Sequence, residues 1–180
     1  MTNIPAIRSP VLVVVDIQRE YTTPGRPFYL HGIAESLDNC ARILDHARER
    51  HWPVLHVQHT QEGPVFSAEH ARFVDHFEPL PEESVFTKSQ ISPYTNPVFK
   101  ESMLAMKDRE VLITGYGSTM CCLATVISGS LFGLRHSFVG DASWARSPAG
   151  DISEAEAHRH AVAIAGIHGR LRTTEEVLQM

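Results

Sequence analysis

The chain has 180 residues, a length typical of a single domain over 1–180, with 43% hydrophobic and 21% charged residues. A net charge of −5 and the lack of a basic stripe argue against a nucleic-acid partner. No apolar run approaches the ~20 residues of a membrane helix, and the N-terminal residues form no apolar signal region. We therefore expect a cytoplasmic protein without membrane contacts.

The first half of the chain alternates aliphatic runs with helical patterns. Val11–Val15 is a continuous aliphatic run, which predicts a buried parallel strand. Residues 33–50 carry apolar side chains at helical spacing, and 54–58 predict a second strand. A short third strand is predicted at 85–87, and a helix at 97–106.

The second half continues the alternation. Residues 111–114 predict a strand that is followed at once by Gly115 and by a helix over about 119–132. Another strand is expected at 136–140, then an amphipathic helix over 154–166 that ends at a C-cap glycine. A strand at 171–173 and a short helix close the chain. This order predicts an α/β protein whose parallel sheet is covered by helices on both faces.

Three residues that can carry chemistry follow predicted strands: Asp16, Lys88 and, slightly later, Cys121. Ligands of parallel sheets bind beyond the carboxyl ends of the strands, so these side chains are expected to meet there. A partly buried carboxylate at position 16 would have a raised pKa and suit proton transfer. An acid that merely leaves the core and caps a loop gives the same pattern, and Lys88 alone also fits a solvated surface lysine.

Cys121 lies in the segment VLITGYGSTMCCLAT, where glycines at 115 and 117 permit a sharp turn before the helix. In the first helical turn, the dipole and free amides favour a thiolate and can bind an oxyanion. Both Cys121 and Cys122 also fit small buried hydrophobic residues, a reading that suits Cys122 better. The chain has 3 cysteines, two of them adjacent, so reduced thiols are expected rather than disulfides.

Two other patterns suggest different chemistry. His56 and His59 face opposite sides of a strand unless it ends between them, so we expect structural roles and no metal site. The segment GYGSTM half-matches a dinucleotide fingerprint, with Met120 in place of the third glycine. No GxSxG elbow is present, which argues against a serine hydrolase.

Several segments in order resemble the isochorismatase-like cysteine hydrolases, which include nicotinamidases and N-carbamoylsarcosine amidohydrolases. These segments are VVVDIQREY, TKSQISPY, LITGYGSTMCCLAT, VGDAS and TTEEVL, and they cover nearly the whole chain. The resemblance implies a three-layer α/β/α, Rossmann-like fold with a six-stranded parallel sheet. It also implies a homo-oligomer.

The resemblance further assigns catalytic roles to Asp16, Lys88 and Cys121. It implies a non-proline cis peptide between Tyr116 and Gly117, at the turn that would hold the oxyanion. Enzymes of the family that act on isochorismate have glycine in place of the cysteine, so Cys121 argues against that reaction. The segment VQHTQEGP lacks the metal ligands of nicotinamidases. We expect no zinc and no other cofactor.

The resulting hypothesis is a hydrolase that cleaves a small-molecule amide or related C–N bond through a covalent acyl-enzyme. Gln18, Tyr21 and Tyr94, together with Tyr116, are candidate substrate contacts, although ordinary packing fits each equally well. Residues 22–30 are expected to form a rim or a rigid surface loop, with Arg26 either attracting an anion or solvated. A silent binding or scaffold protein on the same fold and a nucleotide-dependent oxidoreductase stay open as alternatives.

Overall fold

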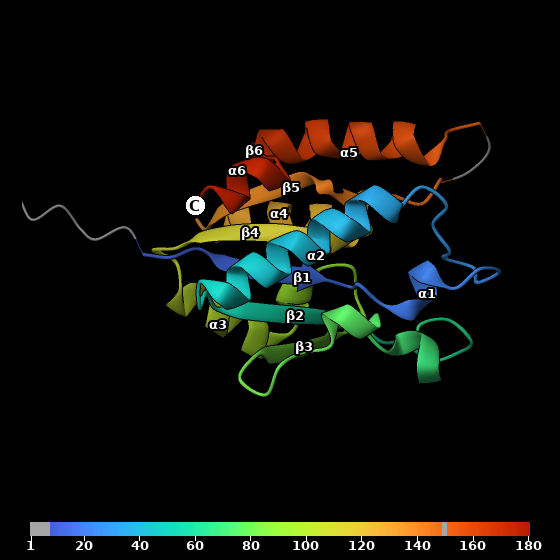
Figure 1. Cartoon of the computed structure of the whole chain (residues 1–180), viewed down its shortest axis with the longest axis horizontal. Helices are drawn as coiled ribbons and strands as arrows, with labels where there is room; N and C mark the ends of the chain where they lie inside the picture. The colour runs from blue at the N-terminus through green and yellow to red at the C-terminus, as the bar shows by residue number, and fades with distance from the viewer. Residues whose placement is uncertain (1–7, 149–150) are drawn as a thin grey trace, which may run out of the picture.

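The computed structural model describes residues 8–148 and 151–180 (Figure 1). Six strands form one sheet in the order β3-β2-β1-β4-β5-β6, and every neighbouring pair is parallel. The strand order reverses between β1 and β4, which is the point where open parallel sheets bind their ligands. The strands are β1 (Val11–Val15), β2 (Val54–His59), β3 (Ser84–Lys88), β4 (Glu110–Tyr116), β5 (Arg135–Trp144) and β6 (Arg170–Arg172).

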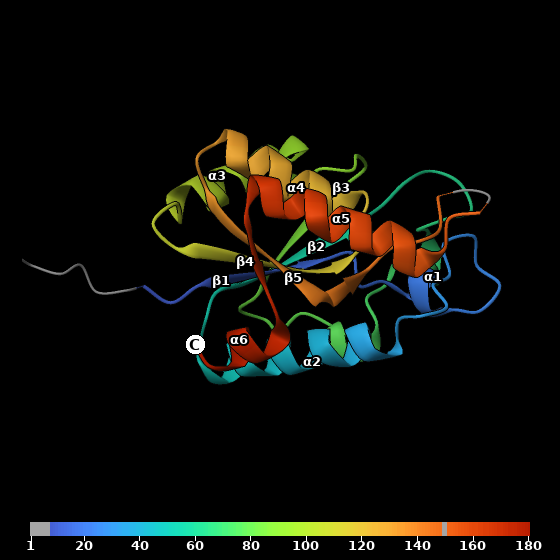
Figure 2. The same cartoon turned by 90° about the horizontal axis from the view of Figure 1, so that it is seen from above.

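Helices cover both faces of this sheet. Figure 2 shows α2 and α6 on one face and α3, α4 and α5 on the other, while α1 lies at the end of the sheet toward which β1 runs. The predicted three-layer α/β/α architecture with six parallel strands is therefore confirmed. None of the helices within the described ranges is long and apolar enough to cross a membrane. The helices are α1 (Arg19–Thr22), α2 (Ala34–Glu49), α3 (Pro97–Ala105), α4 (Cys121–Leu131), α5 (Glu154–His168) and α6 (Thr174–Leu178), with short 3₁₀ turns at Ala68–Ala71, Asp75–Phe77 and Pro93–Thr95.

The β1 strand explains why the core divides into two halves. All five of its residues are buried. Because side chains alternate along a strand, Leu12 and Val14 pack on the α2 face, while Val11, Val13 and Val15 pack on the α4 face. A run of aliphatic residues without polar alternation is what a strand covered on both faces requires.

The β4 and β5 strands extend furthest beyond the ranges that the sequence predicts. Gly115 does not end β4: it stays in the ladder beside Val15, with a φ of +114°. A Cβ at this position would lie 2.0 Å from the carbonyl oxygen of Val15, so only glycine permits so close an approach. The pairing of β4 with β5 shifts register here, and β5 continues to Trp144. The α5 helix also runs past Gly166 and ends at His168, with Gly169 as its C-cap.

His136 on β5 gives the fold a measurable pH dependence. Its ring is buried and lies 3.0 Å from the Tyr94 hydroxyl, and burial lowers its pKa to about 4. Between this value and about 6.5, the unfolded chain binds a proton that the native protein does not, so stability falls as the pH is lowered. We expect acidification across this window to remove about 3 kcal/mol of unfolding free energy through His136.

Urea unfolding at a series of pH values measures this loss. A His136→Gln variant should show a shallower dependence on pH than the native protein, and replacing the exposed His160 in the same way should not change the slope. Equal slopes for native protein and His136→Gln would contradict the assignment.

Candidate active site

Three side chains from different elements meet at the carboxyl edge of the sheet. The Lys88 ammonium, at the end of β3, donates to Asp16 Oδ2 at 2.7 Å and to Cys121 Sγ at 3.3 Å. Asp16 follows β1, and Cys121 is the first residue of α4. All three residues are buried. The structure thus brings together the residues that the sequence analysis placed at strand ends, on either side of the switch point between β1 and β4.

The backbone at Asp16 turns sharply to hold this carboxylate at the sheet edge. Its φ of +51° lies in the left-handed region, which aspartate tolerates better than most residues. The Asp16 amide still donates to Val57 in β2 at 3.0 Å. Asp16 Oδ1 is buried and has no hydrogen-bond partner within the described part of the chain. This oxygen is therefore available to accept a proton.

The turn that presents Cys121 differs from the expected one. No cis peptide bond occurs in the described residues, so the bond between Tyr116 and Gly117 is trans, and the expectation of a cis bond is wrong in this structure. Gly117 makes the turn instead, with a φ of +74° that glycine adopts readily. Its carbonyl accepts from the amides of Met120 and Cys122, at 2.8 and 3.0 Å.

Two backbone N–H groups of the turn are free to bind an oxyanion. Those of Thr119 and Cys121 have no acceptor among the residues that the structure describes. They stand at the start of α4, where unpaired amides and the helix dipole favour a negative charge. A Cβ on Gly117 would lie 3.2 Å from the Cys121 nitrogen, so glycine keeps the approach to this amide open. The arrangement can hold an oxyanion.

Electrostatics at the site differ from those expected for a free helix N-terminus. Burial and the charge of Asp16 raise the pKa of the Cys121 thiol to about 12, against the opposing effect of Lys88. The expectation of a lowered thiol pKa is therefore wrong, because loss of hydration and the charge of Asp16 outweigh the effect of Lys88. Burial would lower the pKa of Lys88, but its interactions with Asp16 and Cys121 outweigh this effect and raise that pKa. The resting site holds a thiol beside an ion pair.

A cavity of about 690 Å³ opens over Cys121. Its lining is mostly apolar, and none of the described residues that form it is acidic. Gly117 and Cys121 are part of the lining, and His59 and Arg146 are its basic residues. The apolar and aromatic side chains are Tyr21, Phe28, Phe66, Ile91, Met120 and Pro148.

The candidate substrate contacts separate into two groups. Tyr21 lines the cavity, and Tyr116 packs behind it with the two ring centroids 5.5 Å apart. Gln18 and Tyr94 do not line the cavity, contrary to expectation. Tyr94 points into the core on the α3 side and pairs with His136. Gln18 is fully buried, and its side-chain amide binds the backbone. Its Nε2 donates to the carbonyls of His59 and Ala71.

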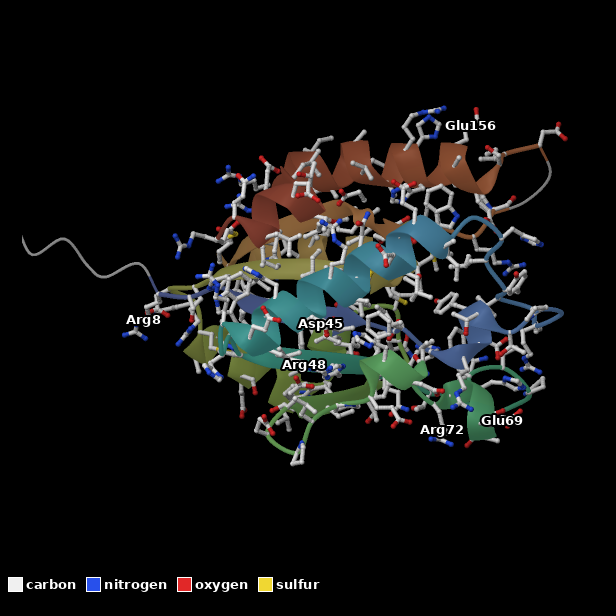
Figure 3. The ribbon with its side chains drawn as sticks, viewed as in Figure 1. Arg8, Asp45, Arg48, Glu69, Arg72 and Glu156 are labelled. Atoms are coloured by element: carbon white, nitrogen blue, oxygen red, sulfur yellow. The ribbon has the colours of Figure 1, made fainter. Side chains whose placement is uncertain are left out.

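His56 and His59 separate as strand geometry predicts. His56 is buried and lies 2.8 Å from Glu83, which also binds Arg48 reaching over from α2 (Figure 3). Burial would raise the pKa of Glu83, but hydrogen bonds from Arg48, the Leu80 amide and His56 lower it to about 2. Within the described ranges, no cluster of three His, Cys, Asp or Glu side chains could hold a metal ion.

The loop over 22–30 forms one wall of the cavity through Phe28. Arg26 does not face the site: its guanidinium donates twice to the buried Glu20, at 3.1 and 2.8 Å, and also to the Pro64 carbonyl. Glu20 in turn accepts from the amide of Phe66, whose ring also lines the cavity and packs against that of Phe28, with the centroids 5.0 Å apart. Arg26 therefore ties this loop to the segment that carries Pro64 and Phe66, and it is neither an anion site nor a freely solvated residue.

Two parts of the site were not predicted from the sequence. His59 was weighed as a metal ligand and expected to have a structural role, yet its Nδ1 lies 3.1 Å from Lys88 Nζ. One signal for this contact was available: His59 is the last residue of β2 and pairs with Lys88 in the strand register. Arg146 and Phe66 come from loops, and nothing in their local sequence indicates that they reach the cavity.

Comparison with known proteins gives consistent results. Residues 10–173 match the family model described as Isochorismatase domain. The chain is 29% identical to the uncharacterized isochorismatase family protein YddQ of Bacillus subtilis, covering 93% of this chain and 98% of that protein. A crystal structure of an isochorismatase from Pseudomonas putida superposes with a TM-score of 0.83 at 26% identity, covering 94% and 92% of the two chains. A shorter match, 33% identical over 60 residues, covers 33% of this chain and 28% of a maleamate amidohydrolase from Pseudomonas putida.

The burial of Lys88 changes the expected effect of replacing it. If Lys88 lay in an open cleft, we would expect Lys88→Ala to lose turnover with little loss of stability. The side chains of Lys88 and Asp16 are instead both 0% exposed, so Lys88→Ala leaves a buried carboxylate without its partner. We expect a loss of about 3–5 kcal/mol in unfolding free energy, measured in urea.

A matched variant separates charge from packing. Combining Lys88→Ala with Asp16→Asn removes both charges, and asparagine tolerates the left-handed backbone at position 16. This double variant should recover part of the lost stability, while Lys107→Ala, on the exposed surface, should cost little. If Lys88→Ala unfolds at the same urea concentration as the native protein, the buried ion pair is not stabilising.

Proposed function

The chain belongs to the isochorismatase family, and we propose that it is a cysteine hydrolase that cleaves an amide or related C–N bond in a small-molecule substrate. The observation that carries the proposal is the position of Lys88 Nζ, within hydrogen-bond distance of both Asp16 and Cys121 beside a mostly apolar cavity. A nucleophile, a base and a fixed cation are the parts that covalent acyl transfer requires.

The proposed reaction begins when the substrate covers the thiol. Asp16 takes the thiol proton, and the thiolate forms a C–S bond to the carbonyl carbon while the carbonyl oxygen becomes negative. The open amides of Thr119 and Cys121 receive that oxygen. Asp16 then gives its proton to the nitrogen as the C–N bond breaks, and the amine leaves.

Hydrolysis of the acyl-enzyme reverses these roles. A water molecule loses a proton to Asp16 and attacks the thioester carbon. The C–S bond breaks, the acid product is released, and the sulfur recovers a proton from Asp16. Lys88 keeps its positive charge throughout, since both Asp16 and Cys121 raise its pKa. Its charge compensates whichever partner is ionised at each step.

The cavity lining indicates which substrates fit. Aromatic walls at Tyr21, Phe28 and Phe66 favour a flat or branched apolar group. Arg146 stacks over the Phe28 ring, 5.0 Å from its centroid, and forms no ion pair with a carboxylate within the described residues. We therefore propose an amide whose apolar part fills the cavity and whose anionic group, such as a carboxylate, faces Arg146.

Alkylation distinguishes Cys121 from its neighbour. Cys121 lines the cavity, whereas Cys122 is fully buried and its thiol donates to the Tyr116 carbonyl at 3.2 Å. We expect iodoacetamide at neutral pH to modify Cys121 much faster than Cys122, as measured by peptide mapping. Cys121→Ala should fold but release no ammonia in a screen of amides and ureides. Cys122→Ala should remain active and lose roughly 1–2 kcal/mol of stability.

Two results would show that the nucleophile is assigned wrongly. One is a label found mainly on Cys122, and the other is a Cys121→Ala protein that still turns over the substrate found in the screen.

The role of Arg146 can be tested before the substrate is known. Iodoacetate and iodoacetamide have nearly the same size, but only iodoacetate carries a carboxylate. In Arg146→Gln, the rate of Cys121 alkylation by iodoacetate should fall about threefold to fivefold relative to that by iodoacetamide. The control is Arg50→Gln, because Arg50 follows α2 at the opposite end of the sheet. If the ratio of the two rates does not change in Arg146→Gln, the anion subsite is refuted.

A further inference from the structure

We propose that His59 is a positioning residue of the catalytic cluster, holding the Lys88 ammonium between Asp16 and Cys121 by accepting its third hydrogen bond. The inference rests on the proposed function, because it concerns the same site. It begins from the contact between His59 Nδ1 and Lys88 Nζ, at 3.1 Å.

Strand order explains why such a residue is needed. Lys88 ends β3 and Asp16 follows β1, and β2 runs between them. Neighbouring strands lie about 4.8 Å apart, so the lysine must cross about 10 Å, over the end of β2, to reach the carboxylate. His59 is the residue at that end, and it is paired with Lys88 in the strand register. The long side chain therefore passes directly beside the imidazole.

The hydrogen bonds of Lys88 determine which nitrogen of the His59 imidazole carries a hydrogen. An ammonium has three donors and no acceptor, and Lys88 has three partners: Asp16 at 2.7 Å, His59 at 3.1 Å and Cys121 at 3.3 Å. The Nδ1 atom of His59 must therefore be unprotonated, and Nε2 carries the hydrogen. That hydrogen faces Gln61 Oε1, 3.2 Å away. Neutral His59 thus completes the coordination of the lysine.

Gln18 holds the backbone of His59 from both sides. Its Oε1 accepts from the His59 amide and its Nε2 donates to the His59 carbonyl, both at 2.8 Å. The imidazole also packs edge-on against Phe66, with the centroids 4.9 Å apart. A buried glutamine that binds both the amide and the carbonyl of one residue holds the backbone of that residue more firmly than a solvent-facing histidine requires. Gln18 thus contributes to the site indirectly.

The arrangement makes the cluster sensitive to acid. The groups that face His59 are Lys88 from β3, Asp16 from β1 and Gln61 from the following loop, with Cys121 of α4 on the far side of the ammonium. Burial and the charge of Lys88 lower the pKa of His59, so the ring is neutral near neutral pH. Protonation would turn Nδ1 into a donor, remove the third bond of Lys88 and set two cations side by side.

Two substitutions at position 59 separate the hydrogen bond from the bulk of the ring. His59→Leu fills a similar space without an acceptor, whereas His59→Asn places its Oδ1 near the Nδ1 position and cannot be protonated in this pH range. The readout is the rate of Cys121 alkylation by iodoacetamide in the full-length protein, which needs no substrate. We expect His59→Leu to react about tenfold more slowly than the native protein, equivalent to about one pKa unit of the thiol. His59→Asn should stay within about threefold.

The pH profile supplies a second readout that a purely structural role would not move. Well below the ordinary histidine pKa of about 6.5, where His59 with its lowered pKa gains a proton, the native rate should fall more steeply with acidification than the rate of His59→Asn. His51→Asn is the control, because His51 is an exposed histidine whose left-handed backbone asparagine also tolerates. Circular dichroism checks the fold, and His59→Ala replaces His59→Leu if the latter does not fold.

The outcomes distinguish the inference from the proposed function. If His59→Leu reacts as fast as the native protein, or if the leucine and asparagine variants are equally slow, the positioning role is refuted. The same holds if His59→Asn keeps the native pH profile. In each of these cases the native label still maps to Cys121. If it maps to Cys122, the proposed function itself fails.

Discussion

A buried ion pair between Lys88 and Asp16 is the constraint on which the rest of the site depends. Removing two charges from water costs several kcal/mol per ion, and a contact of 2.7 Å offsets this only if the remaining donors are also satisfied. The other partners of Lys88 are His59 and Cys121. These four residues come from β1, β2, β3 and α4, so the ion pair is stable only when the sheet and the nucleophile turn are both assembled.

Much of the fold could be predicted because the sheet is covered on both faces. A strand such as Val11–Val15 then consists of aliphatic residues alone, which is a strong local signal. The element boundaries were less predictable where a residue acts through its tertiary surroundings. Gly115 is typical of a strand end in sequence, but the adjacent backbone of β1 holds it in the ladder. Similarly, α5 passes through Gly166 because Gly169 provides its cap.

The site was predictable to the extent that strand ends define it. Asp16 and Lys88 come directly from their strands, and topology brings such ends together. Gln18 is as close to Asp16 in sequence as a pocket residue would be, yet it turns toward backbone that lies 41 residues away. The pKa of the Cys121 thiol depends mainly on how far the folded chain excludes water from it, and the local sequence does not show this burial. Side-chain direction and hydration thus account for the errors.

The raised pKa of Cys121 has a consequence for chemical durability. Peroxides oxidise thiolates through sulfenic to sulfinic and sulfonic acids, and the later steps are not reversed by thiols. With a pKa of about 12, the sulfur at rest is almost entirely protonated and is a poor target for such oxidants. In the proposed reaction, the thiolate forms only when a substrate covers the thiol and the proton moves to Asp16. The proposed nucleophile would thereby be protected from oxidative damage between turnovers.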